Sequence, residues 1–198
     1  MKKNMLRVTL LAVFIILVML INMPLTDENK TKAFTLPGLP QPIAEEPIVI
    51  TSAGQSTDTY IVYDIANRLM IRSYFMPQAI DIEIKEAKTI VFVVGYSSLG
   101  MKLQGKSYVQ EKERIEELIK NTHNNCTIVT VAMRGEQQYD NKTAELLRLV
   151  CSHSDYLIGM RESSNEIILA EIAREKDIPL TLVAGVNDIA EPFASAFR

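Results

Sequence analysis

The 198-residue sequence contains no tryptophan, two cysteines and two histidines, and it has no excess of basic residues. Its formal net charge is −3 and its isoelectric point is near 5.5. Proteins that bind nucleic acid normally carry a basic patch, so we expect no nucleic-acid partner. Two cysteines are also too few for the disulfide framework of a small secreted scaffold.

One long apolar segment lies at the N-terminus. Lys2, Lys3 and Arg7 precede residues 8–21, which carry no charge. Burying such a run in lipid is favourable by about 0.8 kcal/mol per CH2 group. The cations stay on the cytoplasmic side of the membrane. We therefore expect residues 1–25 to be a membrane anchor or a signal peptide, with the rest of the chain outside the cytoplasm.

Two features favour an anchor that is retained. A cleaved signal peptide ends in a small-x-small site such as Ala-x-Ala, and none follows the apolar run. No cysteine directly after the run could carry a lipid. A membrane-spanning helix needs about 20 residues, with roughly 17 as the lower limit, and Leu6–Leu25 meets this length. The alternative is a cleaved signal peptide and a secreted protein.

Proline is concentrated in residues 26–46, for example at Pro37, Pro40 and Pro42. Proline fixes φ and removes a backbone donor, so this stretch is predicted to be an extended, semi-rigid linker. Residues 47–198 remain for one domain, and this length of about 150 residues is enough for a proper hydrophobic core.

Apolar, β-branched runs alternate with amphipathic segments throughout residues 47–198. The predicted strands are Ile48–Thr51, Ile90–Val94, Cys126–Met133, Asp155–Ile158 and Leu180–Val183, with an edge strand near Tyr74–Ala79. Helical patterns lie between them, and Ser163 and Glu166 have the spacing of a capping box before one of these. This alternation predicts an α/β fold, a doubly wound parallel five-stranded sheet with the flavodoxin-like strand order 2-1-3-4-5.

Ligands of such sheets bind outside the carboxyl ends of the strands. The first loop there contains Ser52, Gly54, Gln55, Ser56 and Thr57 and leads into a predicted helix. Its backbone donors, its hydroxyl groups and the helix dipole are suited to an anion. The loop has neither the lysine of a P-loop nor a GxGxxG pattern. The alternative is a tight turn in which a serine or threonine caps the helix.

A second loop, rich in glycine and serine, contains Gly95, Ser97 and Ser98, and it is predicted to be flexible. Such loops close over ligands in some proteins and are plain surface connections in others. Arg134 and Arg161 follow the next two strands, and arginines at one sheet edge suit a carboxylate or a phosphate. The alternative is that each arginine pairs with a neighbouring glutamate in a solvated ion pair.

The two cysteines and two histidines are predicted to lie at the opposite edge of the sheet. His123 and Cys126 precede one strand, and Cys151 and His153 precede the next. Three alternatives stay open: a Cys126–Cys151 disulfide, worth about 3 kcal/mol, a Cys2His2 zinc site of unusual spacing, and two free buried thiols.

Catalysis has little support in the sequence. A nucleophilic serine needs a positioned base, and both histidines are expected at the edge opposite the ligand-binding loops. No HExxH motif or metal-type carboxylate cluster is present. The pattern favours a binding module over an enzyme.

Three stretches resemble an uncharacterised bacterial family, a domain of unknown function that usually follows an N-terminal signal or anchor. They are Pro47–Ser56, which includes Ile-Thr-Ser-Ala-Gly-Gln-Ser, then Val-Val-Gly-Tyr-Ser-Ser-Leu-Gly up to Gly100, and Asp155-Tyr-Leu-Ile. The resemblance covers nearly all of the chain after the linker, and it implies no established activity.

The loops also show a remote resemblance to flavodoxins. Residues 52–57 are similar to the flavodoxin phosphate loop, and residues 95–100 to the loop that flanks the isoalloxazine ring. The resemblance implies FMN contacts from Ser52, Ser56 and Thr57 and ring stacking by Tyr139. Gln55 and Leu99 depart from the family pattern, which expects an asparagine and an aromatic residue there.

These observations lead to one preferred hypothesis and two alternatives. The preferred one is an uncharacterised, membrane-tethered extracytoplasmic module that binds a small polar or anionic ligand, or a partner protein, at the carboxyl edge of the sheet. It needs no cofactor. The alternatives are an FMN-binding redox protein and a structural component of an envelope complex.

Overall fold

The computed structural model describes residues 38–122, 126–133 and 141–198. The expected anchor, residues 1–25, lies outside these ranges. Among the residues that are described, no helix has both the length and the apolar character that crossing a membrane requires.

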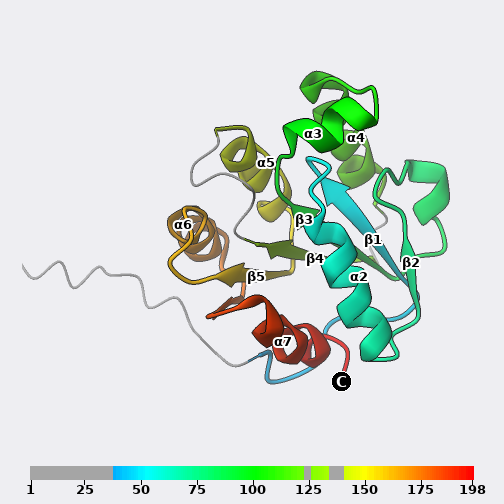
Figure 1. Cartoon of the computed structure of the whole chain (residues 1–198). Helices are drawn as coiled ribbons and strands as arrows, with labels where there is room; N and C mark the ends of the chain where they lie inside the picture. Colours follow the sequence, from blue (N-terminus) through cyan, green and yellow to red (C-terminus); the bar gives the residue numbers. More distant parts are fainter. Residues whose placement is uncertain (1–37, 123–125, 134–140) are drawn as a thin grey trace, which may run out of the picture. The chain divides into compact units, whose positions relative to one another are not determined.

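The domain is built on one sheet of six parallel strands in the order β2-β1-β3-β4-β5-β6 (Figure 1). The strands are β1 (Ile48–Ala53), β2 (Ser73–Phe75), β3 (Thr89–Val94), β4 (Thr127–Ala132), β5 (Tyr156–Met160) and β6 (Leu180–Val183). The α/β class, the parallel sheet and the order of the first five strands confirm the prediction. The sheet has six strands and the predicted number of five is wrong, because both the edge strand β2 and the strand predicted at Leu180–Val183, which is β6, pair in the sheet.

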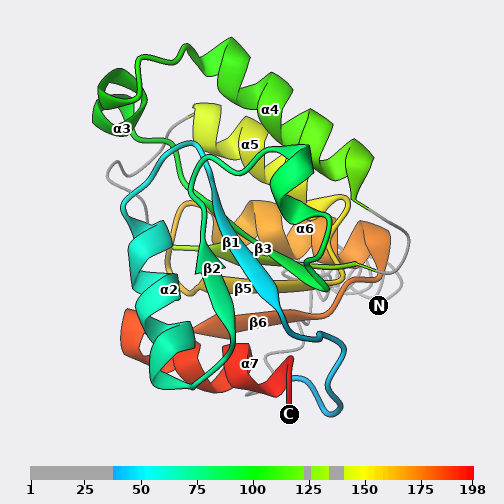
Figure 2. The same cartoon turned by 90° about the vertical axis from the view of Figure 1, so that its right-hand side faces the viewer.

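Helices cover both faces of the sheet (Figures 1 and 2). They are α2 (Asp58–Arg68), α3 (Ser98–Leu103), α4 (Tyr108–Asn121), α5 (Asn141–Cys151), α6 (Glu166–Lys176) and α7 (Ala190–Ser195), with the 3-10 turns η1 (Asp81–Ile84) and η2 (Val186–Ile189). The helices α4, α5 and α6 pack on one face, and α2 and α7 pack on the other.

Alternation along the strands produces these two cores. In β3, Ile90, Phe92 and Val94 face α4 and α5, whereas Val91 and Val93 face α2 and α7. All six residues of β3 are buried. A strand that is buried on both sides must be apolar throughout, which explains the continuous β-branched runs in the sequence.

Part of the predicted linker packs against the domain. The N–H groups of Ile43 and Ala44 donate to the Ala196 carbonyl at 2.9 and 2.8 Å, and Leu39 N–H donates to the Ser195 hydroxyl at 2.8 Å. Residues 38–46 therefore belong to the packed structure, although their prolines predicted a free spacer.

This segment crosses the amino edge of the sheet. The Thr89 hydroxyl, at the start of β3, donates to the Glu45 carbonyl, and the Thr127 hydroxyl, at the start of β4, donates to the Ile43 carbonyl. The chain thus enters the domain at the edge opposite the loops that were predicted to bind a ligand.

The structure corrects two local predictions. The Ser163 hydroxyl donates to the Met160 carbonyl at 2.7 Å instead of capping α6, which begins after Asn165. The segment Gly95–Gly100, predicted to be a flexible loop, runs into the short helix α3, and the Ser97 side chain caps it by accepting from Gly100 N–H at 3.1 Å.

Candidate functional site

The first two predicted loops meet at the carboxyl ends of β1 and β3. Gly95 N–H donates to the Ala53 carbonyl at 3.0 Å, and Ser97 N–H donates to the Gly54 carbonyl at 2.8 Å. Gln55 and Tyr96 form an isolated antiparallel bridge. These bonds join residues 52–57 and 95–98 into one continuous surface, as the sequence predicted for neighbouring strands.

The loop at the end of β1, residues 52–57, is called the β1 loop, and it adopts a backbone conformation that only certain residues tolerate. Gly54 has φ +107°, and a Cβ there would lie 2.5 Å from the Gly95 carbonyl oxygen. The next residue, Gln55, has φ +61°. Positive φ at a residue other than glycine costs about 1–3 kcal/mol and persists only where the surroundings hold it.

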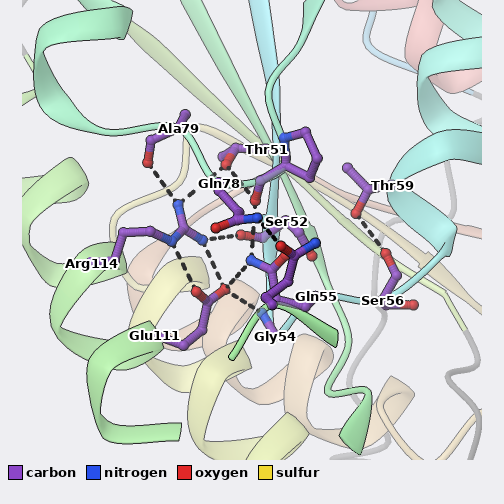
Figure 3. A network of polar contacts seen from close by, with 12 residues as sticks. Thr51, Ser52, Gly54, Gln55, Ser56, Thr59, Gln78, Ala79, Glu111 and Arg114 are labelled. Carbon is purple, nitrogen blue, oxygen red and sulfur yellow. Dashed lines mark hydrogen bonds and ion pairs between the residues drawn. The ribbon is translucent and has the colours of Figure 1, made fainter. Parts of the chain in front are cut away.

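A buried ion pair on α4 holds this loop (Figure 3). Glu111 is fully buried and Arg114 is 7% exposed, and the Arg114 Nη2 atom lies 2.8 Å from Glu111 Oε1. The same carboxylate oxygen accepts from Gly54 N–H at 3.0 Å and from the Gln55 side-chain amide at 2.9 Å. Glu111 therefore bonds to both residues of this loop that have positive φ.

Arg114 connects three segments of the chain. Its Nε donates to Glu111 Oε2, its Nη1 to the Ala79 carbonyl and the Thr51 hydroxyl, and its Nη2 to Glu111 Oε1 and the Ser52 carbonyl. All five guanidinium donors thus have a partner. A buried charge costs several kcal/mol unless it is paired and hydrogen-bonded, and here it is both.

The electrostatics of the pair keep Glu111 ionised. Burial pushes the pKa of the Glu111 carboxyl upward. The hydrogen bonds and charge of Arg114, with the bonds from Gly54 and Gln55, outweigh this effect, so the pKa of Glu111 lies below its usual value.

Several residues predicted to contact a ligand are instead buried, and some of their polar groups are bonded within the protein. Gly54 and Gln55 donate to Glu111. Ser52 is fully buried, and its hydroxyl has no hydrogen-bond partner among the described residues. Ser56 is also buried, and its hydroxyl accepts from Asp58 N–H at 3.2 Å at the start of α2. The loop is therefore, in part, the tight turn that the sequence allowed, but the N-cap residue Thr57 makes no side-chain capping bond to α2.

The exposed polar groups at this edge are fewer than predicted. Thr57 and Ser98 are exposed at the N-terminal ends of α2 and α3, whereas Gly95 and Ser97 are buried. A Cβ at Gly95 would lie 3.1 Å from the Ser56 Cβ, so the glycine permits the close approach of the two loops.

Arg161 projects from the same edge, after β5. Its N–H donates to the Val183 carbonyl at 2.8 Å and its Nε to the Leu182 carbonyl at 3.2 Å, and the residue is exposed. It makes no ion pair within the described ranges. Arg134 and Tyr139, two further predicted contacts, lie outside those ranges.

Both cysteines are free thiols. Burial, together with the charge of Asp155, raises the pKa of Cys126 to about 11. Burial raises the pKa of Cys151 as well. No group of three or more metal-ligating side chains occurs in the described part of the chain, and His123, one of the predicted zinc ligands, lies outside that part. His153 is exposed at the end of α5.

Sequence reasoning missed the Glu111–Arg114 pair. The two residues share the inward face of α4 with Ile115 and Leu118, at the spacing i, i+3, i+4 and i+7. Charged residues within an apolar helix stripe are the signal that could have found them.

Comparison with known proteins adds one finding. A family model described as a domain of unknown function (DUF6305) matches residues 45–197. The chain belongs to this family. The match agrees with the resemblance drawn from the sequence to an uncharacterised domain family. No curated protein and no solved structure matches the chain.

Proposed function

We propose that this domain is an extracytoplasmic binding module, tethered to the membrane by its N-terminal segment, that recognises an anionic ligand or an anionic surface of a partner protein. The binding surface is the carboxyl edge of the sheet, where Thr57, Ser98 and Arg161 are exposed. The tether rests on the sequence of residues 1–25, and mass spectrometry of the native N-terminus would test whether this segment is retained.

The single observation that carries the proposal is that Arg161 is held in place by hydrogen bonds but makes no ion pair with a described residue. Two hydrogen bonds to β6 fix its backbone and its Nε, while no carboxylate of the described residues neutralises its charge. The alternative that it pairs with its neighbour Glu162 is therefore disfavoured. An arginine that is fixed in this way and lies in an exposed position is suited to bidentate contact with a carboxylate or phosphate.

The spacing along the edge limits what can bind. β1 and β5 are separated by β3 and β4, so the β1 loop and Arg161 lie roughly 14 Å apart at the usual strand spacing. A small anion reaches only one of them. A ligand that contacts both is elongated, or it is a protein surface.

An FMN-binding redox protein is the second candidate, favoured by the order of the first five strands. The contacts of Glu111 weigh against it, because this carboxylate holds the Gly54 N–H and the Gln55 amide and would repel a phosphate placed beside them. The test is to incubate the full-length protein with FMN and then remove the free flavin. Protein that retains no visible absorbance after this step would exclude the candidate.

The main experiment is a thermal-shift screen of the full chain with phosphate, polycarboxylates and nucleotides. Binding at a hundred-fold excess over Kd stabilises a protein by about 2.7 kcal/mol. We expect stabilisation of the wild type by at least one of these anions and none for Arg161→Ala. Arg174→Ala removes another exposed arginine, at the far end of α6, and serves as the control that retains the effect.

If no anion stabilises the wild type, the domain does not bind a small anion of the kinds tested. The proposal then stands only as recognition of an anionic surface on a partner protein. Capture from solubilised membranes with wild-type protein and with Arg161→Ala tests this form. A partner that is lost with the variant supports it, whereas equal capture by both proteins, or by neither, removes Arg161 as the recognition residue.

A further inference from the structure

The sheet has an open edge at β2. This strand pairs with β1 on one side, and no described strand pairs with it on the other. Figure 2 looks onto β2, which lies in front of β1 with α2 beside it. Exposed strand edges offer unpaired backbone groups to another chain, and proteins usually protect them.

The backbone groups that face outward can be identified. The Arg72 carbonyl and the Met76 N–H bond to β1 at 3.0 and 2.9 Å. In a parallel ladder, alternate residues bond to the same neighbour, so Arg72, Tyr74 and Met76 face β1. The N–H and C=O groups of Ser73 and Phe75 therefore face away from the sheet.

Exposed apolar side chains flank this edge on both faces. On the α2 face, the Phe75 ring lies 5.1 Å from the Tyr63 ring and 6.0 Å from the Tyr60 ring, between centroids. On the other face, Tyr74 is 50% exposed and Ile82, in η1, is 61% exposed. Contiguous exposed apolar side chains are typical of interaction sites, and the Phe75 ring with its tyrosine neighbours forms such a cluster at this edge.

The edge also lacks the charges that usually prevent pairing. Residues 73–80 read Ser-Tyr-Phe-Met-Pro-Gln-Ala-Ile and contain no charged side chain. Natural edge strands commonly carry a lysine or another charge for protection. The nearest charges along the chain lie at the two ends, with Arg72 before β2 and Asp81 and Glu83 in η1 after it, and the Glu46 carboxylate accepts from Arg72 N–H at 2.8 Å.

We propose that β2 pairs antiparallel with β2 of a second copy of this chain, about a two-fold axis at Tyr74, to form a dimer with a continuous sheet. A two-fold axis places a strand edge against itself in the antiparallel sense, so the contact is closed. This interface is independent of the ligand site, which lies at the carboxyl edge.

The pairing is self-complementary in hydrogen bonding and in size. Each Ser73 comes opposite Phe75 of the second copy, and these outward-facing residues exchange four backbone hydrogen bonds in total. The small serine leaves room beside the phenylalanine ring. The two Tyr74 residues form the central non-hydrogen-bonded pair, whose Cα atoms lie about 4.5 Å apart in such ladders.

Charge complementarity favours a second copy over other occupants. Arg72 lies on the same sheet face as Tyr74 and is exposed. In the antiparallel register it comes opposite Met76 of the second copy, next to η1 with its exposed Asp81 and Glu83. The two-fold axis repeats this contact of opposite charges at the other end.

Cysteine cross-linking of the full chain in mild detergent tests the register. A Cα separation of about 4.5 Å permits a disulfide, so Tyr74→Cys should form a cross-linked dimer on mild oxidation. Leu99→Cys places a cysteine on the carboxyl edge, at a residue that is 60% exposed against 50% for Tyr74, and should form no cross-linked dimer. The wild type controls for Cys126 and Cys151.

Charge reversal tests the interface without a covalent bond. Arg72→Glu should weaken the dimer about ten-fold or more, measured by analytical ultracentrifugation, because two attractive contacts become repulsive. Adding Asp81→Arg to the same chain should restore it, and Glu83 is left unchanged because its carboxylate accepts from Ile80 N–H at 3.0 Å at the start of η1. These side chains are exposed, so folding should be retained, and far-UV circular dichroism checks this.

Two outcomes would overturn the proposal. A monomeric wild type whose Tyr74→Cys thiol reacts rapidly with maleimide would mean that the edge stays open. A monomer whose thiol is protected would mean that another segment covers the edge.

Discussion

Replacing Glu111 with glutamine should destabilise the domain more than any exposed charge change. The variant keeps the shape of the side chain but leaves the Arg114 cation buried without a counter-charge. The glutamine amide nitrogen replaces one carboxylate oxygen, so a donor then faces a donor. It faces either Arg114 Nε, which donates to Oε2 in the wild type, or the Gly54 and Gln55 donors, which share Oε1.

The magnitude follows from these contacts. A hydrogen bond to a charged group contributes about 1.5–3 kcal/mol, and breaking a buried ion pair from one side costs about 3–5 kcal/mol. We therefore expect Glu111→Gln to lower the free energy of unfolding by about 3–5 kcal/mol. The assay is urea unfolding of the full chain in mild detergent, followed by far-UV circular dichroism because the chain has no tryptophan.

Arg148→Met is the matched control. It breaks the Arg148–Glu171 pair on the surface, whose atoms are 3.5 Å apart and whose side chains are 58% and 42% exposed. Exposed pairs contribute about 0–1 kcal/mol. If Glu111→Gln costs no more than this control, the inference that the ion pair holds the β1 loop is wrong.

The pH dependence gives a second readout of the same pair. The pKa of Glu111 in the folded state lies below its ordinary value of 4.5. Its contribution to stability is therefore fully present above about pH 5.5 and is lost as the pH falls below 4.5 through the folded-state pKa. The loss in this window should be smaller in Glu111→Gln, which has no carboxyl group to titrate there.

Two further predictions concern the backbone and the thiols. Gly54→Ala should lower the free energy of unfolding in urea by at least about 2 kcal/mol, because it combines positive φ with a clash at the Gly95 carbonyl. Gly105→Ala, at φ +63° with nothing within 4 Å of the new Cβ, should cost only about 1–2 kcal/mol. Equal costs would refute the steric argument. Cys126 has a pKa of about 11 against an ordinary 9.0, so it should react with iodoacetamide at pH 8 about 100-fold more slowly than an unperturbed thiol, and a rapid reaction would contradict this. Because Cys126 and Cys151 are free, reduction should not change the mass of the native protein. A mass increase of about 2 Da on reduction would show a disulfide instead.

Much of the fold could be predicted from local patterns. The helix at residues 58–68 follows from Ile61 and Ile65 at helical spacing, and the apolar run Ile90–Val94 marks a strand buried on both faces. The short edge strand at 73–75 was harder to place, because a three-residue strand with exposed side chains on both faces leaves little periodicity.

The candidate site could be predicted only in part. That the loops at 52–57 and 95–98 would lie together followed from parallel pairing alone. Which of their groups face solvent depended on a partner 57 residues away in sequence, because Gly54 donates to Glu111. Sequence spacing carries no information about a contact of that range.

The sequence by itself determined most of the strands and helices and their arrangement in layers. Strands buried in the middle of the sheet must be apolar on both faces and the covering helices on one face, and both patterns are visible in the chain. Only the tertiary structure decided which groups Glu111 and Arg114 bond, that residues 38–46 pack onto the domain and that no described strand covers the outer edge of β2. Each of these depends on which polar groups meet their partners across the fold, and the free energy of such a contact belongs to the pair and to neither residue alone.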